Sequence, residues 1–394
     1  MTCSHCRQTA GYHSDRERRV VGRAGTLRYR RASYYCRACG HGQAPFDGHA
    51  GITTRQLTPA VERLATLAGA VGPGYERGAD LLRETAGVRL SEATAQRTTE
   101  AAGDRMATLL RRGLVFGPAV RWDWHRDARG RTVAYFTIDA TGTRQPRPGG
   151  GKADGRVAYV AGVYNPAPPD WLRPAGAAPP RRPRYLAGLY PLAELGSLLR
   201  PQAAQVGMDA AAVWVALTDG GNGLEEFCQR RFSRADRVVI RDFYHAAEYL
   251  KALARAPHPR AAAAAQAQGE YWCRFLKAEG GAATLALLRE WARPARRSAA
   301  RREQWAKVEE YFENNRHRME YPEYEAEGWQ IGSGVVESAC KTVVGQRRNG
   351  AGMRWSEAGA HALCHVRALD RSAKGQGDAF WNRKVTKTSV YQLN

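Results

Sequence analysis

The stretch RTVAYFTIDATG, residues 131–142, marks the point where the chain changes from a helical to an extended pattern. Its residues alternate as in a half-buried strand, and the strand is predicted to stop at Asp139. GRVAYVAGVYN (155–165) and PRYLAGLYP (183–191) follow as two further candidate strands. The segments between them, TRQPRPGGGKAD and PAPPDWLRPAGAAPPRRP, are predicted to be loops because of their Gly and Pro content.

Helices and strands alternate after these three strands. A helical segment from about Leu192 to Ala212 precedes VWVALTDGG, a buried strand that ends at Asp219. NGLEEFCQRRF gives one more helix, and RVVIRDFYHAAEYLKAL gives a strand that leads into a helix. Three strands followed by alternating helix and strand predict a mixed sheet flanked by helices, in the α+β or α/β class.

Three acidic residues occupy positions that suit metal binding. Asp139 and Asp219 each end an apolar strand, and Glu337 lies on an apolar helical stretch. Three such carboxylates could hold two Mg²⁺ (or Mn²⁺) ions about 4 Å apart for phosphodiester cleavage. Each acid taken singly could merely cap a turn, but that alternative does not explain the joint pattern. Asp242, which also ends a strand, is a competing second carboxylate.

The charge balance points to a polyanionic partner. Sixty basic residues face thirty-eight acidic ones, a formal charge of +22 that is too large for an ordinary enzyme of small neutral metabolites. Only eight of the basic residues are lysines, and the arginine fork suits bidentate phosphate contacts. The sequence shows neither an apolar signal segment nor a bilayer-spanning stretch, so we expect a cytoplasmic protein without a membrane partner.

Four of the eight cysteines form two close pairs near the start of the chain. Cys3 and Cys6 make one C-x2-C knuckle, and Cys36 and Cys39 make the other, with a short predicted hairpin between them. Four thiolates at this spacing predict a structural Zn²⁺ site of the zinc-ribbon type, with disulfides as the alternative. The other four cysteines are predicted to be buried free thiols.

A helical region follows the cysteines. LTPAVERLATLAGAVG has the apolar spacing of an amphipathic helix, and two further helical stretches are broken at Gly87-Val88-Arg89, with Ser91 as a cap. This pattern is typical of a helix-turn-helix whose second helix offers Gln96, Arg97 and Thr98 to a major groove. Helical hairpins that never touch DNA share the pattern, so that alternative stays open.

The blocks TIDATG, LTDGGNG, RDFYHAAEYL and IGSGVVESACKTVVGQRRNGAGMRW resemble the signature blocks of the ISKra family of bacterial insertion-sequence transposases. The resemblance covers nearly the whole chain. It implies a DDE enzyme with a ribonuclease H-like fold, a helical insertion, and Asp139, Asp219 and Glu337 as the catalytic triad. It also implies that Asp242 and His245 form an accessory element with His245 near the scissile phosphate; the alternative is a histidine packed at a helix start.

For the chemistry, the resemblance implies metal-dependent cleavage at a transposon end that leaves a 3′-hydroxyl, which then attacks a target phosphodiester without a covalent protein intermediate. The implied partner is double-stranded DNA, bound by a homodimer or higher oligomer in the bacterial cytoplasm, in association with the nucleoid. Arg347, Arg348 and Arg354 are predicted to bind phosphates beside the cut site, with a solvated basic face as the alternative.

These inferences predict a multidomain chain. Its parts are a zinc ribbon (1–50), a helical DNA-binding region (51–126), the first part of the catalytic core (127–250), a helical insertion (251–326), and the C-terminal core helices with a basic tail (327–394).

Two other functions remain possible at this stage. A metal-dependent DNA nuclease would share the three acids but not join strands. A transposase-derived DNA-binding regulator would need the charge and the helices but not all three acids.

Overall fold

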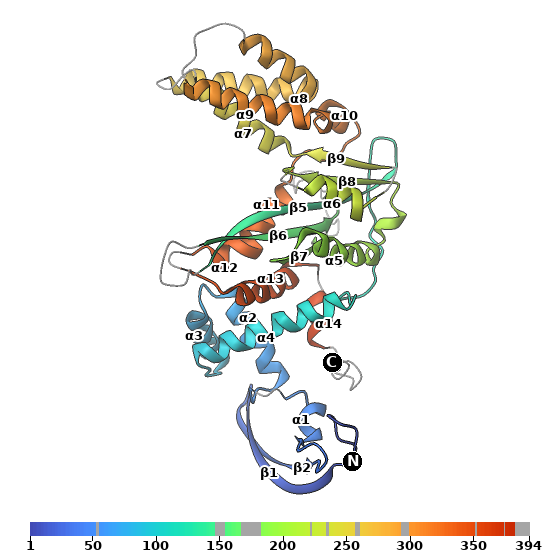
Figure 1. Cartoon of the computed structure of the whole chain (residues 1–394), viewed down its shortest axis with the longest axis vertical. Coiled ribbons are helices and arrows are strands. Elements are labelled where there is room, and N and C mark those ends of the chain that lie inside the picture. Colours follow the sequence, from blue (N-terminus) through green and yellow to red (C-terminus); the bar gives the residue numbers. More distant parts are fainter. Residues whose placement is uncertain are drawn as a thin grey trace, which may run out of the picture.

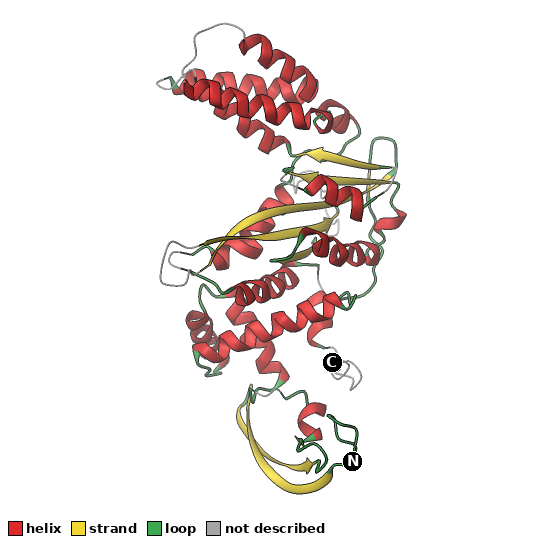
Figure 2. Ribbon diagram, in the orientation of Figure 1, coloured by secondary structure: helices red, strands yellow, loops and turns green. Residues whose placement is uncertain are grey.

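The computed structural model describes residues 1–52, 55–145, 154–166, 183–220, 223–233, 236–256, 261–292, 299–350, 353–373 and 375–382. The molecule is elongated (Figure 1): the N-terminal hairpin lies at one end, a mixed sheet in the middle, and a bundle of long helices at the other end. Figure 2 shows that strands are confined to the hairpin and the central sheet, with helices between and around them. The two predicted Gly- and Pro-rich loops fall mostly outside the described residues.

The N-terminal unit is built on a long antiparallel hairpin. Its elements are β1 (Gly11–Gly22), β2 (Gly25–Tyr35), the short β3 (Gly42–Gln43) and α1 (Pro45–His49). The hairpin predicted between the cysteine pairs is confirmed, although it is longer than predicted because its strands pair over their whole length. The strand order is β1-β2-β3, and β3 pairs only with the last two residues of β2.

Three helices follow: α2 (Pro59–Val71), α3 (Tyr75–Ala86) and α4 (Glu92–Arg111). The predicted break is confirmed. Helix α3 ends at Gly87, which adopts a left-handed conformation, and Ser91 caps α4 by accepting a hydrogen bond from Thr94 N–H. Leu57, Val61 and Leu82 belong to a small apolar core of this region.

The central sheet is mixed, as the sequence predicts. Its strands are β4 (His125–Arg126), β5 (Thr132–Gln145), β6 (Asp154–Tyr164), β7 (Arg184–Gly188), β8 (Val213–Thr218) and β9 (Arg237–Arg241). The order is β7-β6-β5-β8-β9, with β4 paired to β5. Strands β5, β6 and β7 are antiparallel neighbours, whereas β8 and β9 run parallel to β5.

Alternate residues of β5 face two different cores. Phe136 and Ile138 pack on one face with α5 (Leu192–Gln205) and α6 (Leu224–Arg231). Val133 and Tyr135 pack on the other face with a helical bundle. The bundle consists of α7 (Phe243–Arg255), α8 (Ala262–Ala292, kinked at Gly280), α9 (Ala299–Asn315) and α10 (Tyr321–Ala326). Short 3-10 turns lie at Met208–Ala210 and Arg316–Arg318.

The C-terminal helices return to the β6 and β7 side of the sheet. They are α11 (Gly334–Ala339), a π-helical turn (Cys340–Gly345), α12 (Gln346–Arg348), α13 (Glu357–Arg371) and α14 (Gln376–Trp381). Val336, Ala339 and Cys340 pack on Val160 of β6. One face of the sheet is therefore covered partly by the α7–α10 bundle and partly by α11 and the π turn, with β5 between them.

Candidate active site and metal centre

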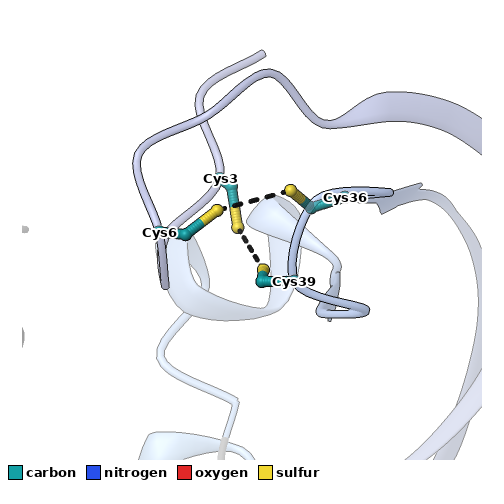
Figure 3. Close-up of side chains that lie close together, drawn as sticks. All are labelled: Cys3, Cys6, Cys36 and Cys39. Atoms are coloured by element: carbon teal, nitrogen blue, oxygen red, sulfur yellow. Dashed lines mark hydrogen bonds between the residues drawn. The ribbon is translucent and has the colours of Figure 1, made fainter.

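Four cysteine side chains converge at the N-terminal end of the molecule (Figure 3). The ligand atoms of Cys3, Cys6, Cys36 and Cys39 all lie within 4.8 Å of one another. Cys3 Sγ lies 3.7 Å from Cys39 Sγ, and Cys6 Sγ lies 3.5 Å from Cys36 Sγ. These separations exceed the length of a disulfide bond, about 2.0 Å. They match the edge of a tetrahedron around an ion held by sulfur at about 2.3 Å, so the group could bind a metal ion such as zinc.

The protein backbone favours a thiolate at Cys3, whereas at Cys39 a backbone hydrogen bond from His41 is outweighed by burial and the neighbouring thiols, which raise the pKa. A hydrogen bond from the backbone N–H of Cys6 leads the interactions that lower the pKa of Cys3 to about 6. Because the thiolate is the metal-binding form, a lowered pKa suits a ligand cysteine. Four thiolates would complete the coordination of zinc, so a metal here would support the fold rather than act on a substrate.

The two aspartates of the predicted triad lie on neighbouring parallel strands. Ile138 of β5 is in register with Thr218 of β8, so Asp139 and Asp219 are the next residues along each strand. They follow Tyr135 and Leu217 at even spacing, which places them on the face that the bundle covers in part. Asp139 differs from the prediction in one respect: β5 continues to Gln145, so Asp139 lies within the strand instead of at its end.

Glu337 reaches the same place from the C-terminal helices. It lies on α11, whose neighbouring residues Val336 and Cys340 pack on the sheet. Ser333 Oγ donates a hydrogen bond to Glu337 Oε1 at 3.2 Å and so fixes the start of this helix relative to the carboxylate. Asp139, Asp219 and Glu337 are all partly buried rather than fully exposed.

Asp139 interacts electrostatically with the other two acids of the predicted triad. Burial is the main cause that raises the pKa of Asp139, and the negative charges of Asp219 and Glu337 raise it further. Hydrogen bonds from Ala140 N–H at 2.6 Å and from the Cys340 thiol at 3.3 Å act in the opposite direction. Residues separated by some 200 positions in sequence therefore share a negatively charged site, which we call the carboxylate cluster.

The carboxylate cluster is looser than the cysteine cluster. Within the described residues, the four cysteines are the only group of three or more possible ligands whose atoms all lie within 4.8 Å of one another. A single ion held by all three acids would require a tighter group. Two ions about 3.5–4 Å apart would not, because acids that contact different ions can lie farther apart. The donor set, three carboxylates and no thiolate or imidazole among the three, suits hard cations such as Mg²⁺ or Mn²⁺.

Cys340 is a member of this site that the sequence did not identify beyond a buried thiol. Its Sγ–H donates to Asp139 Oδ2, and burial together with the charge of Asp139 raises the pKa of the thiol. The signal in the sequence was its spacing of three residues from Glu337, which puts both side chains on one face of a helix.

Asp242 is structural in this fold. It is fully buried and caps α7, with Oδ1 accepting from His245 N–H at 2.6 Å and Oδ2 accepting from Ser333 N–H. Both oxygens are therefore occupied by backbone donors. The ring of His245 packs against Tyr249 and Tyr311, with centroid separations of 5.5 and 6.0 Å. These contacts favour the alternative that His245 is a histidine packed at a helix start.

The prediction that Arg347 and Arg348 grip DNA is wrong in this fold, because both side chains are buried, with 2% and 0% exposure. Arg347 donates to the carbonyls of Gly69 and Pro73 at the C-terminal end of α2 and lies between the rings of Tyr75 and Trp355. The Gly69 carbonyl belongs to the last turn of α2, where the carbonyls lack helical partners and carry the negative end of the helix dipole, so a buried guanidinium stabilises this end of the helix.

Arg348 performs a similar structural task inside the core. Its guanidinium donates to Cys364 Sγ and to Thr143 Oγ1 on β5. Arg354, by contrast, is exposed and remains able to contact a phosphate. Gln96 and Arg97 are also exposed on α4, whereas Thr98, predicted to face a groove with them, is buried.

Comparison with known proteins adds no family to these observations: no family model and no curated protein matches the chain. Among the helices of the described residues, none has the length and hydropathy needed to cross a bilayer.

Proposed function

We propose that the chain is a DDE transposase that binds transposon ends and catalyses metal-dependent DNA cleavage and strand transfer. The observation that carries the proposal is the carboxylate cluster, in which the charges of Asp219 and Glu337 raise the pKa of Asp139. Repulsion among acids is costly, and an acid whose pKa is raised by burial and by neighbouring negative charges is typical of functional sites.

The mixed sheet supports a ribonuclease H-like catalytic core. Three antiparallel strands are followed by two strands parallel to the first, and the acids stand on the two adjacent central strands, β5 and β8. The assignment of the fold rests on this arrangement together with the resemblance of the aspartate and glutamate blocks.

In the proposed reaction, Asp139, Asp219 and Glu337 would hold Mg²⁺ or Mn²⁺, which would supply Lewis acidity for cleavage of a phosphodiester and for strand transfer. Asp139 lies within β5 and Asp219 directly follows β8, so the paired strands anchor the backbone at both acids. Glu337 is positioned by α11 and by its hydrogen bond from Ser333. The fixed geometry serves the in-line approach that phosphoryl transfer requires.

The surface outside the cluster supports a DNA partner. The formal charge of +22, the exposed Gln96 and Arg97 on α4, and the exposed Arg354 beyond Glu337 fit a ligand with a phosphate backbone. The four-cysteine group, with zinc bound, would stabilise the N-terminal unit. Pairing of two transposon ends requires at least two protomers, so we expect a dimer or higher oligomer on DNA.

The test is a DNA cleavage and joining assay with Mg²⁺, using DNA that contains the ends of the element and a supercoiled target plasmid. Asp139→Asn and Glu337→Gln are expected to lower both cleavage and joining by at least about a thousandfold, because each removes a metal-binding charge. Asp209→Asn, an exposed acid in the turn before β8, is the matched control and should retain activity.

Three other results would each replace the proposal. Cleavage without a joined product would identify a metal-dependent nuclease. Binding of the ends by wild-type protein without cleavage would identify a DNA-binding regulator. Full activity of Asp139→Asn and Glu337→Gln would show that the carboxylate cluster is not the catalytic site.

A further inference from the structure

The hairpin β1–β2 carries an unusual concentration of arginine. Residues 11–35 contain seven arginines and two acids, and no lysine. More than half of the residues of each strand are exposed. The third strand, β3, pairs only with the last two residues of β2, and a two-stranded hairpin is marginal by itself. Few of the hairpin residues are buried, so an apolar core does not explain its length. Its composition therefore calls for a reason other than the packing of a core.

The two faces of the hairpin differ in how their arginines are neutralised. On the face toward α1, Asp47 accepts hydrogen bonds from Arg18, Tyr29 and Arg31. Burial acts against ionisation of Asp47, but the hydrogen bonds from Tyr29 and Arg31 and the charges of Arg18 and Arg31 outweigh it, and the pKa of Asp47 is lowered. This contact clamps the hairpin around α1, which lies inside the bow of the strands (Figure 1).

The opposite, outward face carries two acids, Asp15 and Glu17, but both are exposed, whereas Asp47 is buried. Arg19 on β1 is directly opposite Arg28 on β2, and Glu17 is opposite Arg30. All four side chains are exposed, and the ion pair between Arg19 and Glu17 is long, at 3.9 Å. Like charges directly opposite each other in a sheet are destabilising. The protein thus maintains an arginine pair that works against the hairpin itself.

The hairpin is also held at both ends, so its outward face is preorganised. At one end Cys36 follows β2 directly and joins the cysteine cluster. At the other end Val21 N–H donates to the Gln56 carbonyl at 2.8 Å, and Thr58 N–H donates to the Val21 carbonyl at 3.0 Å. A surface that is already ordered loses little conformational entropy on binding.

A charged edge also protects a hairpin from pairing with other chains, and this is the simplest alternative. That role is served by either sign of charge and by isolated residues. It does not explain why the outward face repeats one residue type that forms bidentate contacts with phosphate, nor why opposed arginines are retained.

We propose that the outward face of β1–β2, with Arg19, Arg28 and Arg30, is a binding surface for the phosphate backbone of double-stranded DNA. A two-stranded β-ribbon is one of the elements that the major groove of B-DNA admits, which places basic side chains next to phosphates. The inference rests on the proposed function, because it adds a second DNA contact to that of α4. The cysteine cluster then has a task in recognition: it holds one end of the ribbon.

The experiment measures binding of full-length, zinc-loaded protein to a 30-base-pair duplex of arbitrary sequence, without added Mg²⁺, across a range of salt concentrations. The test variant, which we call the ribbon variant, is the triple substitution R19Q/R28Q/R30Q in β1 and β2. The matched control is K251Q/R255Q/R274Q, which removes three exposed positive charges from α7 and α8 in the helical bundle.

The ribbon variant is expected to bind at least about tenfold more weakly at physiological salt. The slope of the logarithm of the binding constant against the logarithm of the salt concentration is expected to become shallower by about 2 to 3. Each lost phosphate contact lowers the magnitude of that slope by about 0.9. The control should change both quantities by less. Zinc content and thermal stability of the ribbon variant should be unchanged or higher, since the substitutions relieve repulsion between Arg19 and Arg28.

Equal losses in the two variants would overturn the inference, because only net charge would then matter. An affinity and a salt slope that are unchanged in the ribbon variant would also overturn the inference. The proposed function would still stand in that case, provided that the wild-type protein binds and joins DNA. A ribbon variant that lost affinity for a 30-nucleotide RNA but not for the duplex would identify a different partner. Failure of the wild-type protein to bind the duplex at all would overturn both proposals.

Discussion

The molecule contains two clusters of potential metal ligands that are built in opposite ways. The cysteine cluster brings four thiols within 4.8 Å of one another in a segment that has little core of its own. The carboxylate cluster assembles from β5, the end of β8 and α11 over a large apolar core, and its acids stay farther apart. In the first, the ligands make the local fold; in the second, the fold positions the ligands.

The difference has a physical basis. A small unit without a core gains its stability from the ion itself, so its ligands must be close enough to saturate the ion. A catalytic cluster has to leave coordination positions for substrate oxygens, and its charges repel each other until cations arrive. Metal removal should therefore unfold the first site and leave the second intact.

The largest effect is expected at the cysteine cluster. Cys36→Ser removes one of four ligands at a site where zinc binding is worth on the order of 10–16 kcal/mol in comparable small units. We expect loss of the bound zinc and of hydrogen-exchange protection in β1 and β2, while the central sheet remains protected. Metal analysis and hydrogen exchange followed by mass spectrometry measure both. Retention of an ordered hairpin without zinc would show that the ion does not make this fold.

A smaller effect is expected from the backbone that holds Asp219. Gly220 has a φ of +72°, and a Cβ at this position would lie 0.9 Å from Nη1 of the buried Arg241. Gly220→Ala combines backbone strain with overpacking and is expected to lower the free energy of unfolding by about 3 kcal/mol. Urea denaturation of the zinc-loaded protein measures the change.

Gly113→Ala is the control for that substitution. Gly113 has a similar φ of +78°, but a Cβ there would meet nothing within 4 Å. Only the strain of the left-handed backbone remains, and it is expected to lower the free energy of unfolding by about 1–2 kcal/mol. Equal destabilisation by the two substitutions would mean that the contact between Gly220 and Arg241 does not constrain the loop beside Asp219.

The smallest effect concerns repulsion within the carboxylate cluster. Because the folded state raises the pKa of Asp139, ionisation of this acid is less favourable in the folded than in the unfolded chain. The resulting loss of folding stability is absent below the pKa of Asp139 in the unfolded chain. It grows as the pH rises toward the pKa of Asp139 in the folded chain, and it is constant above that pKa. Asp139→Asn removes that cost. Without divalent cations other than zinc, the variant is expected to melt about 1–3 °C higher than wild type at pH 7.

Two further readings of the same melting experiment sharpen the result. The difference between Asp139→Asn and wild type should shrink as the pH falls below the pKa of Asp139 in the unfolded chain, where the acid is protonated in both states, and should reverse when Mg²⁺ stabilises only the wild-type protein. A variant that melts at a lower temperature than wild type at pH 7 would indicate that Asp139 is stabilised by its surroundings instead of strained by them.

The sequence was sufficient for the elements that depend on local pattern. The mixed sheet, the break at Gly87, the cap at Ser91 and the cysteine knuckles all followed from alternation, turn chemistry or spacing. The joint placement of Asp139, Asp219 and Glu337, two acids after buried strands and one on a late helix, predicted a shared site, and the electrostatic interaction of Asp139 with the other two agrees with that prediction.

The roles of individual charged residues were harder to predict, because burial is set by contacts that are distant in sequence. Arg347 is buried because α2, nearly 280 residues away, ends against it, and Arg19 is exposed because none of the described elements covers its side of the hairpin. Both look alike in a list of basic residues. Asp242 was similarly ambiguous until Ser333, some 90 residues later, was found to donate to it.

Direct titration of Mn²⁺ into zinc-loaded protein, with free Mn²⁺ followed by electron paramagnetic resonance, tests the carboxylate cluster without depending on any DNA sequence. We predict that wild-type protein binds about two Mn²⁺ ions per chain. Asp139→Asn and Glu337→Gln should each lose at least one of them, and Asp209→Asn should lose none. Wild-type binding that is unaffected by either cluster substitution would contradict the existence of a shared metal site.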